Sequence, residues 1–128
     1  MRFMIIVKAS PESEHGVMPS QARFDEMAAY HSELARAGVL LDANGLQPSS
    51  LGWRIRYRGK ERSIVDGPFT ESKELIAGYT LISVRSREEA LEWARRFPNP
   101  RGEERATEIE VRQVFEPGDL VPSDAIAR

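Results

Sequence analysis

Two ionisable residues in this sequence could work together in acid–base chemistry. His31 is the ionisable residue on the apolar face of an expected helix, and an imidazole titrates near neutral pH. Asp66 opens a rigid Asp-Gly-Pro turn, which could hold a carboxylate still at the mouth of a pocket. In that arrangement His31 would act as a general base or contact a ligand, and Asp66 would orient the imidazole or a water molecule.

Both residues also have a purely structural interpretation. A single histidine at a helical core spacing is often hydrogen-bonded to a backbone group or a carboxylate without any chemical role. An Asp before Gly-Pro can accept a hydrogen bond from the backbone two residues on, while Gly67 supplies an unusual dihedral angle and Pro68 fixes the next one. Phe69 is left unexplained by this interpretation, and we expect it to anchor the turn in the core. The residue types alone leave both interpretations open.

Three further residues are candidates for ligand binding. Lys73 and Glu74 belong to the charged segment that follows the turn, where Lys73 could meet an anionic group and Glu74 could act as an acid or base. The alternative is that this segment is a solvated loop or a single helical turn. Asp42 follows an apolar strand and could face either a pocket or an interface.

Arg54 forms a basic ladder with Arg56 and Arg58 on one face of an expected strand. Guanidinium groups suit carboxylates and phosphates, so Arg54 is a candidate ligand contact. The alternative is an exposed hairpin whose like charges discourage edge pairing. Three arginines in a chain of net charge −2 do not indicate binding to nucleic acid.

The composition argues against several other classes of protein. The chain has 128 residues and no cysteine, which excludes disulfides, thiolate nucleophiles and cysteine-bound zinc. No ligand spacing, phosphate-binding glycine loop or nucleophile elbow is present, so we expect no metal and no cofactor. The first residues do not resemble a signal peptide, and no apolar stretch approaches the roughly 20 residues of a membrane helix. We expect a soluble intracellular protein that does not bind membranes.

The hydrophobic pattern predicts one domain over residues 1–116 and a loose tail over 117–128. Apolar runs and period-two alternation indicate strands, and three- and four-residue spacings after Ser20 and Ser86 indicate two amphipathic helices. Ser86 and Glu89 are expected to form a reciprocal capping box. Loops are expected at 9–19 and 44–50. Strands are expected at 3–7, 39–41, 53–58, 62–66, 75–84 and 107–115.

Two helices cannot cover both faces of an antiparallel sheet this wide. They would cover one face and leave the other, partly apolar, face exposed as an association surface. We therefore expect a homodimer whose two subunits pack sheet against sheet about a two-fold axis.

Several short motifs together resemble one known family. DGPF at 66–69, ESKE at 71–74, AGY at 77–79 and EEALEWA at 88–94 resemble the YCII-related proteins, in the branch named for its DGPF motif. FMIIV, AGVLL and GLQP add to the resemblance, which covers residues 2–115. It implies an α+β fold with a ferredoxin-like antiparallel sheet, two helices on one face and an inserted β-hairpin. It also implies assembly into a dimeric α/β barrel and a bacterial, cytoplasmic setting.

The resemblance implies two alternatives for function. One is a homodimer that binds a small molecule in a ligand-binding or regulatory role, with a protein of a sigma-factor pathway as a candidate partner. The other is a cofactor-free enzyme that uses His31 and Asp66 in acid–base chemistry on a small polar or aromatic substrate. A better-studied branch uses a histidine and an aspartate at positions that hold Met27 and Phe97 here, so the activity of that pair is not carried over.

Overall fold

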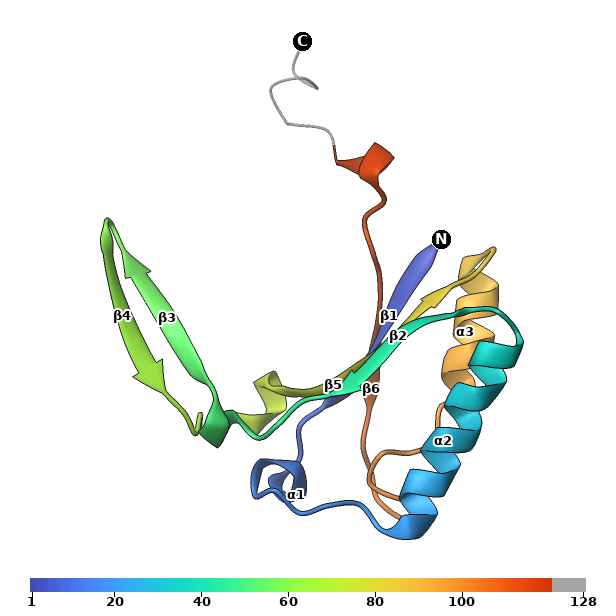
Figure 1. Cartoon of the computed structure of the whole chain (residues 1–128), viewed down its shortest axis with the longest axis horizontal. Helices are drawn as coiled ribbons and strands as arrows, with labels where there is room; N and C mark the ends of the chain where they lie inside the picture. Colours follow the sequence, from blue (N-terminus) through green and yellow to red (C-terminus); the bar gives the residue numbers. More distant parts are fainter. Residues whose placement is uncertain (121–128) are drawn as a thin grey trace.

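The computed structural model describes residues 1–120, in which two helices cover one face of an antiparallel sheet and a hairpin projects away from it (Figure 1). The strands are β1 (Arg2–Lys8), β2 (Leu40–Gly45), β3 (Trp53–Arg58), β4 (Glu61–Asp66), β5 (Ile76–Ser83) and β6 (Ile109–Gln113). The α-helices are α1 (Pro11–Glu14), α2 (Gln21–Arg36) and α3 (Arg87–Arg95). Single 3₁₀ turns are η1 (Ser49–Leu51), η2 (Ser72–Glu74) and η3 (Pro117–Asp119).

The main sheet has the strand order β2-β5-β1-β6, and every neighbouring pair is antiparallel. Leaving out the β3–β4 hairpin, the chain follows a βαββαβ order, which is the ferredoxin-like arrangement. Strand β5 is central, as its uncharged sequence predicts, because a strand with neighbours on both sides cannot readily hold charges.

The two long helices begin and end where the sequence predicts. The Ser20 hydroxyl accepts from the amide of Arg23, and Gly38 follows the helix with a φ of 75°, a left-handed value that favours glycine. The Ser86 hydroxyl accepts from the amide of Glu89 at 3.1 Å. The expected capping box is only half formed, since the Glu89 carboxylate accepts from the amide of Arg85 rather than from Ser86.

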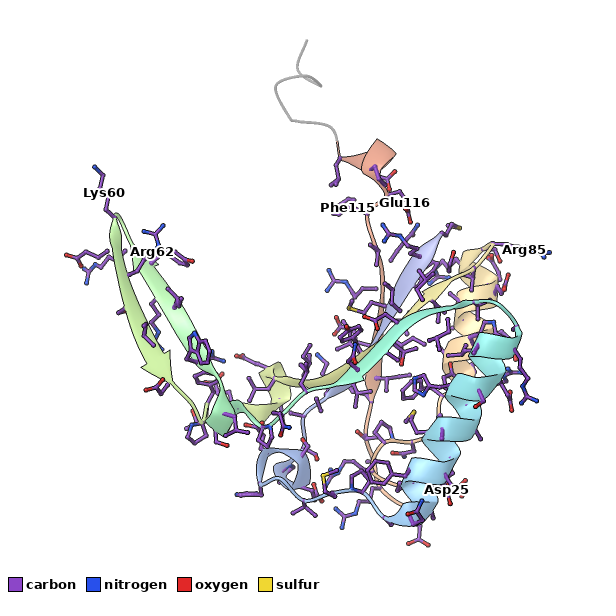
Figure 2. All side chains as sticks on the ribbon, viewed as in Figure 1. Asp25, Lys60, Arg62, Arg85, Phe115 and Glu116 are labelled. Carbon is purple, nitrogen blue, oxygen red and sulfur yellow. The ribbon has the colours of Figure 1, made fainter. Side chains whose placement is uncertain are left out.

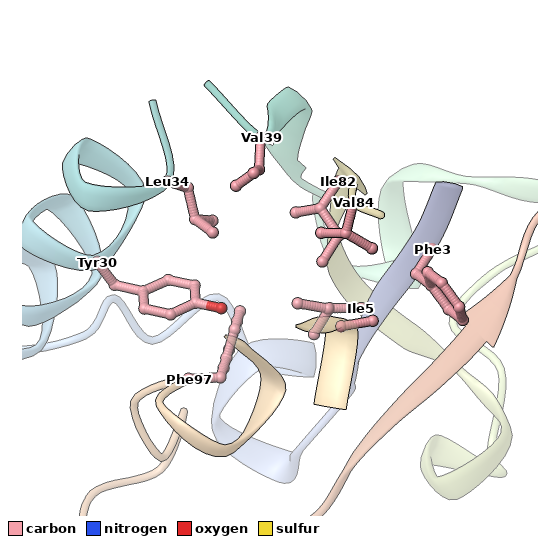
Figure 3. Packing of buried hydrophobic residues seen from close by; sticks show 9 residues of the cluster. Phe3, Ile5, Tyr30, Leu34, Val39, Ile82, Val84 and Phe97 are labelled. Carbon is pink, nitrogen blue, oxygen red and sulfur yellow. The ribbon is translucent and has the colours of Figure 1, made fainter. Parts of the chain in front are cut away.

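The hydrophobic core lies between the sheet and these two helices (Figure 3). Ile5 and Ile82 from the central strands are fully buried against Leu34 of α2. Tyr30 crosses the layer, packs edge-on against Phe97 at 5.1 Å between ring centroids, and donates to the backbone carbonyl of residue 93 at 2.8 Å. Burial raises the pKa of Tyr30 to about 12, so this hydroxyl stays protonated and acts as a donor.

Two expectations about local structure are wrong. The segment 9–19 is not entirely a loop, because Ser10 and Ser13 cap each other and start the short helix α1. Residues 44 and 45 do not form a turn, because both extend β2 and pair with Tyr79 and Gly78 of β5. The hairpin is exposed, as one of the two interpretations of its arginines assumed, because β3 and β4 form a separate two-stranded sheet.

The C-terminal end of the described chain is tied to the first strand. The Arg2 guanidinium pairs with the Glu116 carboxylate at 3.1 Å. The backbone carbonyl of Arg2 accepts from the amide of residue 114. The rest of the expected tail, residues 121–128, lies outside the described residues. No helix within residues 1–120 is both long and apolar enough to cross a membrane.

Candidate functional site

A groove of about 1710 Å³ opens at the end of the sheet where α1, the first half of α2 and the edge strand β2 meet. Its inner wall comes from β5, and its sides come from α2, the loop after α3 and the DGPF turn. Apolar side chains contribute most of the lining surface, among them Phe24, Met27, Leu40 and Phe97. The groove is therefore an open, largely apolar site with a small number of polar groups, which is the usual character of a small-molecule pocket.

His31 lies half-buried in this groove and uses both nitrogens of its ring. Nδ1 lies 2.9 Å from the backbone carbonyl of Met27, and Nε2 lies 2.8 Å from Oγ1 of Thr80. A carbonyl oxygen can only accept, so Nδ1 carries the proton and, in the neutral ring, Nε2 accepts from the Thr80 hydroxyl. A hydroxyl can also accept, so the same contact survives when the imidazole is protonated. The pair can therefore hold His31 in either charge state.

The burial of Thr80 holds in place the hydroxyl that contacts Nε2 of His31. Thr80 is 2% exposed on the helix-facing side of β5, between Gly78 and Ile82. The phenyl ring of Phe97 lies edge-on to the imidazole at 6.5 Å between centroids. Apolar surroundings strengthen the hydrogen bond between His31 and Thr80. They also favour ligands that can form hydrogen bonds with these two side chains.

The structure does not bring His31 and Asp66 together as a hydrogen-bonded pair within one chain. Asp66 is exposed at the end of β4, where it stands opposite Trp53 in the hairpin ladder, and it does not line the groove. Both nitrogens of His31 are occupied by other groups. The physical reason is that Asp66 is the last residue of the β3–β4 hairpin, which projects away from the main sheet (Figure 1).

The DGPF turn is shaped by a close backbone contact. A Cβ atom added at Gly67 would lie 1.8 Å from the carbonyl oxygen of Ser49, so only glycine fits there. The φ of Gly67 is not positive, and the peptide bond that joins Gly67 to Pro68 is cis. The amide of Gly67 donates to the carbonyl of Gly52 at 3.0 Å, and the amide of Phe69 donates to Oγ of Ser49 at 3.0 Å.

Phe69 does not enter the main core, contrary to our expectation. It is half-buried beside the groove, and the Arg54 guanidinium lies over its ring at 3.9 Å from the centroid. Arg54 is thus positioned by a cation–π contact at the base of the hairpin. Lys73 and Glu74 are exposed in η2, a single helical turn, and neither lines the groove.

Asp42 lies at the outer rim of the groove in a small polar cluster. Its carboxylate accepts from the Tyr79 hydroxyl at 2.7 Å and from the side-chain amide of Asn44 at 3.1 Å. Asn44 also donates to the Tyr79 hydroxyl at 3.0 Å. Asn44 and Tyr79 stand opposite each other in the β2–β5 ladder, a register that the sequence pattern did not reveal.

Residues 1–116 match the YCII-related domain. The chain belongs to that family. An uncharacterized protein of Rhizobium meliloti strain 1021 is 30% identical over 95 residues, which make up 74% of this chain and 77% of that protein. A solved structure with 18% identity and a TM-score of 0.48 covers 92% of this chain and 97% of its own. It is the 5-chloro-2-hydroxyhydroquinone dehydrochlorinase of Burkholderia phenoliruptrix AC1100 in complex with 2,5-dihydroxybenzoquinone.

Two positions singled out by the family resemblance lie beside His31 in this YCII-related chain. Met27 precedes His31 by one helical turn and contributes the carbonyl that Nδ1 contacts, while Phe97 stands edge-on to the imidazole. Both residues line the groove. The place where a His–Asp pair is implied in the better-studied branch is therefore an apolar wall here, with the imidazole one turn further along α2.

Helix α1 closes one end of the groove of this YCII-related protein through two carboxylates. Glu12 pairs with Arg101 at 3.0 Å and also contacts Arg105, both in the loop after α3. A hydrogen bond from its own backbone amide, followed by the Arg101 guanidinium, lowers the pKa of Glu12 to about 2. Glu14 accepts from the amide of Ser49 at 2.9 Å and from its hydroxyl. Sequence reasoning missed these contacts, which join segments far apart in the chain.

The described residues contain no cluster of three or more His, Asp or Glu side chains that could hold a metal ion. The groove lining includes the imidazoles of His15 and His31, the buried hydroxyl of Thr80, guanidinium groups at the end near α1, and further polar and charged side chains such as Lys8 and Glu26. This set can bind a small organic molecule by hydrogen bonds.

Proposed function

We propose that this YCII-related protein is a homodimer that binds a small molecule in the groove, in a ligand-binding or regulatory role. The apolar part of the ligand contacts Met27 and Phe97, and a polar group of the ligand meets the His31–Thr80 pair. The second subunit covers the face of the sheet that the helices leave open. The observation that carries the proposal is a half-buried imidazole on an apolar groove wall, with its Nε2 atom 2.8 Å from a buried hydroxyl.

An acid–base enzyme is the second candidate, and one observation favours it. The groove wall carries the imidazole of His31, whose Nε2 atom lies 2.8 Å from a hydroxyl that can donate or accept. Within the described part of the chain, however, neither ring nitrogen of His31 contacts a carboxylate that would orient the ring or stabilise its charge. Binding without turnover is therefore the better-supported function.

A ligand screen tests the proposal directly. Phenol, catechol and methyl 4-hydroxybenzoate present a ring and a hydroxyl without a charge, and their dissociation constants can be measured by calorimetry or ligand-observed NMR. We expect at least one of them to bind, and we expect binding to weaken about fivefold in His31→Leu because a hydrogen bond worth about 1 kcal/mol is lost. Thr80→Val should weaken binding less, because it removes the hydroxyl and leaves the imidazole.

The control for these variants is Ser32→Ala, which changes the exposed neighbour of His31. It should bind every probe as the unaltered protein does. Equal binding by His31→Leu and the unaltered protein would contradict the proposal. His31→Gln separates the two candidate functions, because glutamine keeps a polar group near Nε2 but cannot exchange a proton. A binder retains affinity in that variant, whereas an enzyme binds its substrate and loses turnover.

A further inference from the structure

The segment that joins β1 to α2, residues 9–19, forms a large part of the groove wall, and we call it the strap. Residues 10, 11 and 13–19 all line the groove. The strap follows β1 directly, contains α1, and ends at the N-terminus of α2. Figure 1 shows it at the bottom of the molecule, where it passes from the end of the sheet to the start of the long helix. Any movement of the strap therefore changes the shape of the groove.

The strap has little apolar contact with the rest of the protein. Helix α1 has four residues and none of them is buried, and residues 15–19 are all exposed. Val17 is 59% exposed and Met18 is 71% exposed, although both line the groove. A helix of four residues is not stable on its own. Segments with few buried apolar contacts open locally at a lower free energy than global unfolding requires.

Two carboxylates of α1 hold the strap in place. Glu12 pairs with Arg101 at 3.0 Å and also with Arg105, both in the loop after α3. Glu14 accepts from the amide of Ser49 at 2.9 Å and from its hydroxyl, in η1. The side chains of Arg101 and Glu12 are 29% and 38% exposed. Ion pairs that are this accessible to water contribute modestly to stability and are weakened by salt.

Gly16 is placed where the strap could bend. Its φ is 73°, a left-handed value that favours glycine, and a Cβ atom there would meet only Pro48, at 4.0 Å. It separates the part of the strap held by Glu12 and Glu14 from the exposed residues before α2. Residues at the ends of short elements commonly absorb the dihedral changes of a loop movement.

We propose that the strap is a gate of the groove, which Glu12 and Glu14 hold closed and which opens when α1 is released from the loop after α3 and from η1. Opening uncovers the inner wall at Val7, which lines the groove at the end of β1 and packs against the core. The small molecule enters and leaves while α1 is released. This inference rests on the proposed function and adds how access to the groove is controlled.

Hydrogen exchange in the ligand-free protein tests whether the strap opens. The amides of Glu14, His15 and Val17 donate to carbonyls within the strap, so their exchange reports on its opening. In Glu12→Gln these amides should exchange about fivefold faster, as expected for the loss of two partly exposed ion pairs. Amides of β5 and of the middle of α2 should keep their rates. Added salt should speed exchange of the strap in the unaltered protein and change it little in Glu12→Gln.

A single cysteine tests whether opening gives access to the groove. The chain has no cysteine, so Val7→Cys carries one thiol, whose reaction with iodoacetamide can be followed. Adding Glu12→Gln should raise the reaction rate about fivefold. The matched control is Glu103→Gln, which makes the same change of charge at an exposed position of the loop after α3 and should leave the rate unchanged. Low concentrations of urea should also leave the rate nearly unchanged, because a local opening exposes little surface.

Three outcomes would overturn the gate. If Glu12→Gln changes neither exchange nor labelling, the strap is a fixed wall. If exchange in the strap quickens but labelling does not, the strap opens without controlling access. If labelling rises steeply with urea, it reports global unfolding instead. The exchange result needs no cysteine, so it stands even if Val7→Cys is unstable.

The gate and the proposed function can fail separately, because exchange and labelling need no ligand. If no phenol binds but both measurements behave as expected, the gate stands and the proposed function fails. For a phenol that binds, Glu12→Gln should raise the association and dissociation rates together, about fivefold, and leave Kd nearly unchanged. Binding with unchanged rates in Glu12→Gln would support the ligand site and overturn the gate.

Discussion

At the scale of single residues, the DGPF turn is explained by contact rather than by conformation. Gly67 lies against the backbone of Ser49, and the hydroxyl of Ser49 in turn accepts from the amide of Phe69 and donates to Glu14. The turn, η1 and α1 are therefore joined through one serine. This arrangement explains why a small residue and a rigid turn occur together beside the groove.

Gly67→Ala should lower the free energy of unfolding by about 3 kcal/mol, measured by urea denaturation. The added Cβ would lie 1.8 Å from the Ser49 carbonyl oxygen and 2.6 Å from its carbon, so the backbone must move. The amide of Gly67 would then lose its hydrogen bond to Gly52.

Gly118→Ala is the control for this prediction, because a Cβ atom there meets nothing within 4 Å and its φ is not positive. It should change stability by only a few tenths of a kcal/mol. Equal effects of the two substitutions would show that the contact with Ser49 is not what requires glycine.

The candidate site was only partly predictable from residue types. Helical spacing placed His31 on the inner face of its helix, which the structure confirms, because that spacing depends on local geometry alone. Its partner Thr80 lies 49 residues away and was missed, since the contact depends on how β5 packs against α2. The acid–base roles assigned to His31 and Asp66 stay predictions, although the pairing expected between them does not form within one chain.

At the scale of elements, α1 shows how a short helix depends on distant partners. Four residues are too few for a periodic pattern or for independent helix stability. Glu12 pairs with arginines in the loop after α3, and Glu14 binds the backbone and side chain of Ser49 in η1. The helix thus joins the two sides of the groove, and its position should respond to the charge of Glu12.

The contribution of Glu12 to stability should disappear in acid. Its pKa is lowered from 4.5 to about 2 in the folded chain, so the contribution is fully present above pH 4.5 and is lost as pH falls towards 2. The melting temperatures of the unaltered protein and Glu12→Gln should therefore differ at pH 7 and converge between pH 4.5 and pH 2. The exposed Glu103 gives the control, since Glu103→Gln should show no such convergence. A constant difference across this range would contradict the prediction.

The elements themselves were more predictable than their connections. Caps and hydrophobic spacing gave α2, α3 and the central strand β5, because these signals are local. The Asn44-Gly45 pair was wrongly expected to turn, because its ladder with β5 overrides the preference of those two residues. The separation of the hairpin from the main sheet was missed, because alternation in a strand does not reveal whether either face will be covered.

At the scale of the whole molecule, two surfaces are left uncovered in one chain. The sheet face opposite the helices carries Met4 and Ile6 of β1, which alternate with core residues and pair across β5 with Leu81 and Tyr79. The β3–β4 hairpin extends away from the body, with Lys60 and Arg62 at its outer end (Figure 2). Its Ile64 is 70% exposed. Apolar side chains in such positions are typical of association surfaces.

Charge is distributed unequally between the hairpin and the body. Residues 53–66 contain five basic and two acidic side chains, a net charge of +3 in a chain whose total is −2. The rest of the chain therefore carries a net charge of −5, opposite in sign to that of the hairpin. Such complementarity favours association and fixes its orientation.

We propose that the open sheet face is the main contact between two subunits, as the sequence predicts. The unaltered protein should elute with the mass of a dimer, about 29 kDa from two chains of 14.5 kDa, when measured by light scattering. Ile6→Glu should give a monomer, because it puts a carboxylate on the apolar face directly opposite Glu110 in the β1–β6 ladder. Ile64→Glu alters only the hairpin and should leave the dimer intact. If Ile64→Glu dissociates the dimer and Ile6→Glu does not, the hairpin rather than the sheet holds the subunits together. The hairpin of the partner subunit would then be a candidate wall of the groove.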